Sequence, residues 1–239
     1  MSRNPVVWSA IAAAALAGSA RAVVFFDGIF NNSDWTLTTV TNANGLGSTT
    51  NGLQIPVGGN PNQYRRIRNT LNASGPLAAV IGLHMRGTFS YNPGAQAIAS
   101  INYSEDSINF INQPGNGQGS GLVIFQGGTY YIQRTPILVM PYATYNTWQS
   151  NSAPGLLAGD FWELTNTGNL ISSSNPDFST SGGIMQFGFW RGNSGNSSIQ
   201  TDCGIDNWRV EIIPVPAPAG AGALAMAGLI ACQRRRCTP

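Results

Sequence analysis

The sequence has no lysine and few charged residues of any kind. All 12 basic residues are Arg, and charged residues make up only 9% of the 239 positions, against roughly 25% in an average soluble domain. The chain is instead rich in Gly (29 residues) and Pro (14 residues), with abundant Asn, Ser and Thr. A surface of neutral polar groups and turns is typical of an all-β protein.

Positive charge is too scattered to form a nucleic-acid-binding face. Five of the 12 Arg lie in the two terminal segments, so that residues 23–213 hold seven Arg, ten acids and a net charge of −3. The one internal cluster, Arg65, Arg66 and Arg68, alternates partly across a predicted strand. Because phosphate backbones are bound by clustered basic residues, we predict no nucleic-acid binding.

Cysteine and histidine are nearly absent between the terminal segments. Cys203 is the only Cys there, which excludes an internal disulfide framework and favours a small buried hydrophobic residue. The single His, His84, has no Gly-x-Ser-x-Gly motif to accompany it, although a Ser–His–Asp site needs a nucleophile beside the His. We interpret His84 as an ordinary strand residue, and a His/Cys metal site lacks ligands.

A glycoside hydrolase needs two carboxylates roughly 5–10 Å apart, and two pairs of acidic residues that lie close in the sequence do not have the spacing that this requires on a strand. Glu105 and Asp106 are sequence neighbours, so on a strand they point to opposite faces. Asp160 and Glu163 likewise differ by an odd step. We therefore predict no catalytic residues and interpret Glu105 and Asp106 as solvated charges at a strand edge.

Residues 1–22 have the three parts of a secretory signal peptide. Arg3 supplies positive charge, 6–17 form a short apolar segment, and Ala20 and Ala22 occupy the small-residue positions before a cleavage site. The alternative is an N-terminal membrane anchor, but the apolar run is shorter than the ~20 residues that span a bilayer.

The C-terminal segment 214–239 also has three parts. Val215-Pro216-Ala217-Pro218 is a Pro-rich break, 219–232 is an uncharged apolar stretch, and Arg234-Arg235-Arg236 is a positive cluster. Such a cluster stays in the cytoplasm and leaves the preceding domain outside. The apolar stretch predicts a helix of about 14–16 residues, ~21–24 Å long, which is short for a ~30 Å hydrocarbon core.

This tail resembles the PEP-CTERM sorting signal of Gram-negative bacteria, in which Val-Pro-Glu-Pro precedes an apolar helix and an Arg cluster. Ala217 stands where Glu is usual, whereas Pro216 and Pro218 keep their spacing. The resemblance implies a sorting protease of the exosortase type, removal of the tail, and retention at the cell envelope, cell surface or extracellular matrix. The alternative is a plain C-terminal transmembrane anchor.

The middle section, 23–213, reads as short strands between Gly-, Asn-, Pro- and Ser-rich turns, with no helix-period stretch. Period-two alternation in 185–189 and 205–212 predicts half-buried antiparallel strands. About eleven strands fit a single two-sheet jelly-roll sandwich. The predicted strands are 23–27, 35–41, 52–57, 64–71, 79–91, 97–110, 121–133, 147–150, 160–164, 184–191 and 207–213.

Two short segments resemble carbohydrate-binding and laminin-G/concanavalin-like jelly rolls. Phe25-Phe26-Asp27-Gly28 followed by Trp35 resembles their opening strand, and 204–210 resembles their closing strand. The resemblance implies that the first and last strands run side by side. It also implies a structural Ca²⁺ held by Asp27 and Asp206, for which the alternative is capping of turns or strand ends by these side chains.

Aromatic residues between 130 and 148 are candidates for sugar binding, because sugar rings stack on flat aromatic faces. Tyr130, Tyr131, Tyr142, Tyr145 and Trp148 are flanked by polar residues, and we take Tyr130, Tyr131 and Trp148 as the candidate ligand-binding residues. The alternative is that these rings fill the core of the sandwich.

The sequence thus favours an exported surface or matrix protein with a non-catalytic β-sandwich, sorted by its C-terminal segment. The alternative function is that of a polysaccharide-binding module of the same fold. A glycoside hydrolase or lyase is less favoured, because the carboxylate pairs are missing.

Overall fold

A computed structural model describes residues 21–113, 115–140 and 145–216. Residues Ala22–Pro214 form one compact unit. The cleavage residue Ala20, the apolar stretch of the tail, and Ala217, Pro218, Arg234, Arg235 and Arg236 lie outside the described residues. Among the residues described, no helix is long and apolar enough to cross a membrane.

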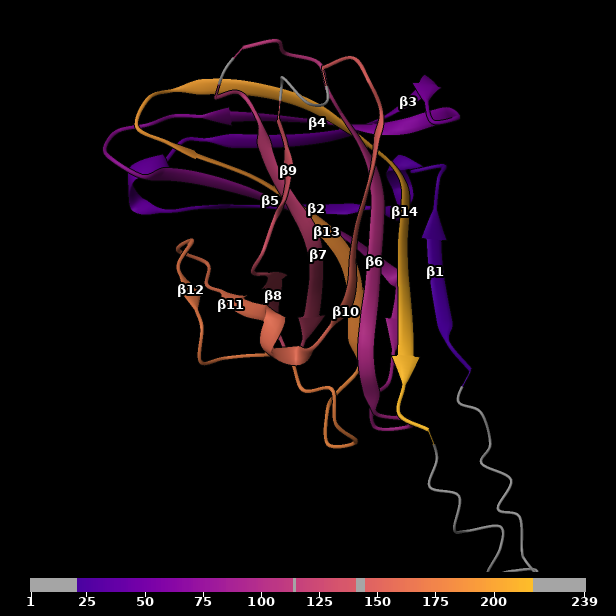
Figure 1. Cartoon of the computed structure of the whole chain (residues 1–239). Helices are drawn as coiled ribbons and strands as arrows, with labels where there is room; N and C mark the ends of the chain where they lie inside the picture. Colours follow the sequence, from indigo (N-terminus) through magenta and orange to yellow (C-terminus); the bar gives the residue numbers. More distant parts are fainter. Residues whose placement is uncertain (1–20, 114, 141–144, 217–239) are drawn as a thin grey trace, which may run out of the picture. The chain divides into compact units, whose positions relative to one another are not determined.

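The unit consists of two antiparallel sheets, which confirms the predicted two-sheet jelly-roll sandwich (Figure 1). One sheet has six strands in the order β10-β6-β14-β4-β3, with β1 also beside β14; the other has eight, in the order β12-β11-β8-β7-β13-β5-β2, with β9 beside β7. The strands are β1 Val23–Asp27, β2 Thr36–Thr41, β3 Thr49–Gly59, β4 Asn62–Leu71, β5 Ala78–Tyr91, β6 Ile98–Asn109, β7 Gln118–Gln126, β8 Thr129–Gln133, β9 Ile137–Val139, β10 Gln149–Leu156, β11 Phe161–Leu164, β12 Leu170–Ile171, β13 Met185–Gly195 and β14 Ile199–Pro214.

The described strands outnumber the eleven predicted from sequence. Residues 121–133 do not form one strand, because Gly127 and Gly128 both adopt positive φ and turn the chain between β7 and β8. The short strands β9 and β12 were not predicted. As predicted, the unit has no long helix among the residues described, only the three-residue 3-10 turns Asn32–Asp34, Ala43–Gly45 and Ala158–Asp160.

The first and last strands lie side by side, as the resemblance implied (Figure 1). β1 pairs with the second half of β14, so that Val23 is opposite Ile212 and Asp27 is opposite Trp208. A bulge at Asn207, which has a φ of 49°, interrupts the alternation of β14. Because of this extra residue, Ile205 and Trp208 both reach the core.

The main core lies between the two sheets and is dominated by aromatic and aliphatic rows from both. Trp208 packs edge-on to Trp35, and Phe89 stacks on Trp208 at 5.7 Å. We call the face of each sheet that is turned toward the other sheet its inner face, and the opposite face its outer face.

A second apolar cluster lies on the outer face of the eight-stranded sheet. It joins Val40 of β2 to Leu164 of β11, although these strands are near opposite ends of the strand order. The turn that follows β11 approaches the end of β2 so closely that a Cβ on Gly168, at a φ of +73°, would lie 2.9 Å from the Asn42 nitrogen. The eight-stranded sheet therefore curls around its own outer face.

Candidate functional site

Glu105 lies at the centre of a polar network between the sheets. Its carboxylate accepts hydrogen bonds from Tyr103, Ser107 and Ser120, and forms a 3.0 Å ion pair with Arg191 of the opposite sheet. Burial first, and then the nearby Glu105 carboxylate, raises the pKa of Tyr103 well above its ordinary value. The three hydroxyl groups and the Arg191 guanidinium thus hold the carboxylate in place.

Asp106 points to the outer face of the same strand, so the expectation that Glu105 and Asp106 face opposite sides is met. The interpretation of both as solvated edge charges is wrong, because β6 is flanked by β10 and β14 and both residues are buried. Asp106 is opposite Asp206 and accepts hydrogen bonds from Asn60, Ser150 and Asn207. Burial, with a smaller contribution from Asp106, raises the pKa of Asp206.

Asp27 and Asp206 lie on opposite faces of the six-stranded sheet. Asp27 is opposite the core residue Trp208, whereas Asp206 faces outward with Asp106. Directly opposite residues of an antiparallel pair share a face, so a calcium ion held by both carboxylates does not fit this arrangement. Within the described residues there is no group of three or more His, Cys, Asp or Glu side chains placed to hold a metal ion.

Asp27 caps the end of β1, which is the alternative that the sequence left open. Its Oδ1 accepts hydrogen bonds from the backbone N–H groups of Ile29 and Phe30, at 2.8 and 2.9 Å. Its Oδ2 accepts one from the Trp35 indole at 2.9 Å and forms an ion pair with Arg86. Melting curves with EDTA and with added Ca²⁺ would check the predicted calcium ion shared by Asp27 and Asp206, and unchanged curves would leave both as structural caps.

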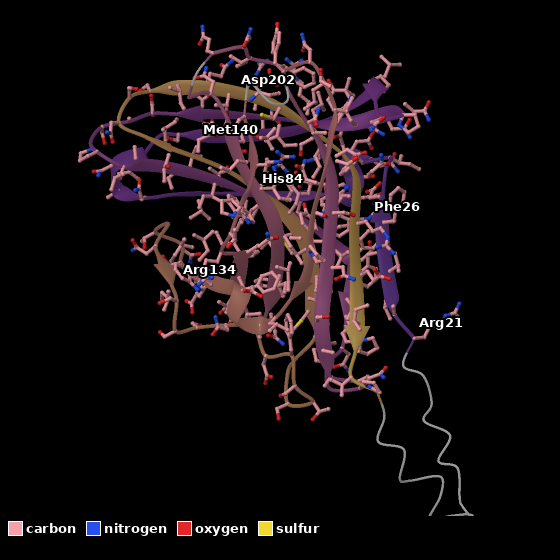
Figure 2. All side chains as sticks on the ribbon, viewed as in Figure 1. Arg21, Phe26, His84, Arg134, Met140 and Asp202 are labelled. Carbon is pink, nitrogen blue, oxygen red and sulfur yellow. The ribbon has the colours of Figure 1, made fainter. Side chains whose placement is uncertain are left out.

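His84 is a fully buried residue of β5, in agreement with its interpretation as a strand residue (Figure 2). The ring stacks on Phe189 at 4.6 Å, and its Nδ1 accepts a 3.4 Å hydrogen bond from Arg65 Nε. Burial, followed by the charges of Arg65 and Arg191, holds the pKa of His84 well below its ordinary value. Burial likewise raises the pKa of the Cys203 thiol to about 12, and Cys203 is a small buried residue as predicted.

The three aromatic residues predicted to bind a ligand lie in three different places. Tyr130 is on the outer face of the eight-stranded sheet, where its ring contacts Phe125 at 4.7 Å. Tyr131, one residue further along β8, packs against the main core instead. Trp148 precedes β10 of the six-stranded sheet and donates a 3.0 Å hydrogen bond to the carbonyl of Gly58. The structure therefore does not bring the three together.

Three pockets adjoin one another at the eight-stranded sheet. The first, of about 220 Å³, is lined by Tyr130, Glu163 and the turn that begins at Thr165. Asn166 lines this pocket and also the second, of about 510 Å³, which lies between the β11–β12 turn and the end of β2. We call these two and the third pocket, described next, the pocket row.

The third pocket of the row has a volume of about 370 Å³ and lies over β5, β7 and β13. Its lining is joined to that of the second pocket by a 2.9 Å hydrogen bond, which the N–H of Ala79 in the third lining donates to Oδ1 of Asn42 in the second. Trp190 and Gly119 form part of its lining, and a Cβ on Gly119 would lie 3.1 Å from the indole. Met140, which also lines it, is labelled in Figure 2.

The pocket row is almost free of charge. Glu163 is the one charged residue among all those that line the three pockets within the described chain, and the second pocket is formed mainly by Asn and Thr. Amide and hydroxyl groups both donate and accept hydrogen bonds. The chemistry of the row therefore suits an uncharged ligand with many hydroxyl groups.

Sequence reasoning found Tyr130 but missed most of the row. Asn42 and Asn166 sit in turns, where Asn is ordinarily explained by backbone geometry. Trp190 stands among core residues in β13, so the sequence pattern predicts a core position for it as well. The signal that was present is compositional, since 160–175 and 41–51 are both rich in Asn and Thr.

No protein-family model matches the sequence, and no curated protein matches it. Among solved structures, the chain is similar to the C-terminal family 22 carbohydrate-binding module of Clostridium thermocellum Xyn10B. The identity is 12%, the match covers 79% of this chain and 93% of that one, and the TM-score is 0.40. It is also similar to the mannan-recognising module TmCBM27, at 9% identity, with coverage of 81% and 99% and a TM-score of 0.42.

Proposed function

We propose that this chain is a non-catalytic polysaccharide-binding protein, and that the pocket row is its binding surface. The observation that carries the proposal is that the linings of the three pockets follow one another: Asn166 lines both the first and the second, and the Asn42–Ala79 hydrogen bond joins the linings of the second and the third. A series of adjoining pockets fits successive units of a chain, whereas a small metabolite needs only one.

The ligand class follows from the lining of the row. With Glu163 as its one carboxylate, the row offers no cation to pair with an acidic sugar. Tyr130 at one end supplies an aromatic face, and Asn and Thr side chains supply hydrogen bonds to hydroxyl groups. We therefore propose a neutral glycan, such as a xylan, a mannan or a glucan.

Binding without catalysis is supported by the positions of the carboxylates. Hydrolysis of a glycoside requires two carboxylates about 5–10 Å apart across the scissile bond. Glu105 is held between the sheets by Arg191, while Asp106 and Asp206 face the other side of the sandwich from the pocket row. Glu163 alone cannot serve as both acid and base or nucleophile.

We further propose export through residues 1–22 and sorting through residues 214–239, on the strength of the sequence features alone. An exosortase-type protease would recognise Val215-Pro216-Ala217-Pro218, and the helix would hold the chain in the membrane until it is cut. The protein would then remain at the cell surface or in the extracellular matrix, where polysaccharide is available.

The binding proposal is tested by affinity electrophoresis of the purified protein in gels that contain xylan, mannan or β-glucan. The side chain of Asn166 has no hydrogen-bond partner among the described residues, so Asn166→Ala should leave the fold intact and weaken retardation by at least one of these polymers. Asn112→Ala, at an exposed position outside the row, is the matched control. Migration that is unaffected by all three polymers would refute the proposal.

The sorting proposal is tested by mass spectrometry of the protein isolated from its own host. Loss of the residues that follow the Pro motif is expected, together with a mature N-terminus at Val23. A cell-associated protein that retains Arg236 would favour the plain anchor, and replacing Arg234, Arg235 and Arg236 with Ser should release the full-length chain to the medium.

A further inference from the structure

The outer face of the six-stranded sheet carries two arginines that share one carboxylate. Alternation along β4 turns Arg65 inward and both Arg66 and Arg68 outward. Asp202 of β14 lies beside them, near the top of the view in Figure 2. Its Oδ2 accepts from Arg66 Nη2 at 2.6 Å and from Arg68 Nη2 at 2.8 Å, and its Oδ1 accepts from Arg66 Nε at 2.7 Å.

The positive charge of this cluster faces solvent, while the negative charge lies beneath it. The side chains of Arg66 and Arg68 are 40% and 50% exposed, whereas that of Asp202 is 5% exposed. A guanidinium has five N–H donors, and each of these two uses only its Nε and Nη2 groups on Asp202. The cluster therefore presents one uncompensated positive charge and several oriented donors.

A small hollow beside the two arginines completes the site. It has a volume of about 140 Å³ and is lined by Asn51, Leu53, Ile55, Arg66 and Arg68. The Asn51 amide has no hydrogen-bond partner among the described residues, and Leu53 is half exposed. The hollow thus combines an apolar wall, a free amide and a positive rim.

Two features hold the arginines in place in the absence of a ligand. The Arg66 guanidinium lies 5.4 Å from the centre of the Phe110 ring, and Asp202 fixes the orientation of both guanidinium groups. A planar guanidinium that is already oriented loses less rotamer entropy when it binds a carboxylate. Two other carboxylates on this face, Asp106 and Asp206, accept hydrogen bonds from Asn60 and Asn207 instead.

We propose that Arg66, Arg68 and Asn51 form a second glycan site, which takes the carboxylate of a uronic acid unit in an acidic polysaccharide. The inference rests on the proposed function in taking polysaccharide as the ligand. The residues that form this site are different ones, and they lie on the opposite sheet. One excess charge matches a single carboxylate, Leu53 and Ile55 contact the C–H face of the sugar ring, and Asn51 binds a hydroxyl group. The sandwich then binds a neutral chain on one outer face and an acidic chain on the other.

The test is isothermal titration of the purified protein with oligogalacturonate, compared with its methyl-esterified form. The acid should bind and the ester should not, because the ester keeps the ring and loses the charge. Arg68→Gln should weaken binding at least about tenfold, as expected for loss of a charge-assisted hydrogen bond. Arg209→Gln, which removes one half-exposed Arg from the same sheet, should leave the affinity unchanged.

Arg68→Lys keeps the positive charge and removes the planar guanidinium, so it separates the effect of charge from that of guanidinium geometry. Its melting temperature shows whether the fold is intact. Equal binding of acid and ester, equal loss in Arg68→Gln and Arg209→Gln, or no binding of oligogalacturonate would each overturn the inference. A clear preference for a sulfated oligosaccharide would overturn the carboxylate assignment. Retardation by neutral polymers, with its dependence on Asn166, is measured separately, so that failure of one site does not imply failure of the other.

Discussion

On the inner face of the six-stranded sheet, charged side chains reach across the sandwich to the other sheet, whereas on its outer face they interact within their own sheet. Three cross-sheet links join Glu105 to Arg191, Asp27 to Arg86, and Arg65 to His84. On the outer side, Arg66 and Arg68 pair with Asp202.

The comparison shows how a chain with few charges uses them. Inside, each charge has a partner that fixes the position of one sheet against the other, and removing that partner leaves a buried charge. Outside, the Arg66 and Arg68 side chains keep contact with solvent and remain available to a ligand.

Arg191→Met should have the largest effect, because it leaves the Glu105 carboxylate buried without its cation. Breaking a buried ion pair by removing one partner costs about 3–5 kcal/mol. The expected loss in the free energy of unfolding is measured by urea denaturation. The double variant Arg191→Met/Glu105→Gln should recover part of the loss; a single variant that loses less than about 1 kcal/mol would contradict the contrast.

Acid should destabilise the protein through His84. Because burial, Arg65 and Arg191 hold the pKa of His84 well below 6.5, the unfolded chain takes up a proton before the folded one does. The free energy of unfolding should therefore fall as pH drops below 6.5, by up to about 1.4 kcal/mol per pH unit. His84→Phe should remove this component from the pH profile; a profile of unchanged slope would argue against it.

Asp206, on the outer face, should change the free energy of unfolding with pH in the opposite direction to His84, and by a smaller amount. Burial raises its pKa, and backbone hydrogen bonds from Asn60 and Asn207 act against that increase. The stability that this group contributes is present below the ordinary pKa of Asp and is lost as pH rises through the raised value. Relative to Asp206→Asn, the wild-type protein should lose stability between acidic and neutral pH, and a gain would contradict the assignment.

Arg209→Gln should have the smallest effect. Arg209 pairs with Glu211 at 3.1 Å, and their side chains are 38% and 26% exposed. Such surface pairs contribute about 0–1 kcal/mol and are screened by salt. A melting temperature close to that of the wild type is expected, and a loss as large as that of Arg191→Met would erase the distinction between the two faces.

The alternation in 205–212 and 185–189 was enough to predict the sheets, because the inward side chains there are apolar on both sides of the bulge at Asn207. It could not show where Glu105 lies, since the buried partner of Glu105 is 86 residues away in sequence. The bulge at Asn207 was also invisible, because it depends on the pairing of β14 with β6.

The candidate site was less predictable than the fold. Tyr130 could be proposed from its aromatic ring, but its neighbour Tyr131 was proposed equally, and only the pairing of β8 decides which one faces outward. The pocket row depends on the close approach of Gly168 to Asn42, which lie far apart in the chain. Curling of a sheet arises from its twist and its number of strands, so no local sequence pattern predicts it.

The pairing of β1 with β14 has a consequence for the order in which this protein folds. β1 is the first strand to be synthesised and β14 is the last, yet Val23 is opposite Ile212. At about 5–20 residues per second, β1 waits roughly 10–40 s for its partner. During that interval the exposed edge of β1, with Phe26 half exposed even in the folded protein, is open to wrong pairing. High contact order of this kind slows folding, so closure of the six-stranded sheet is the step at which a chaperone that shields β1 would have the greatest effect.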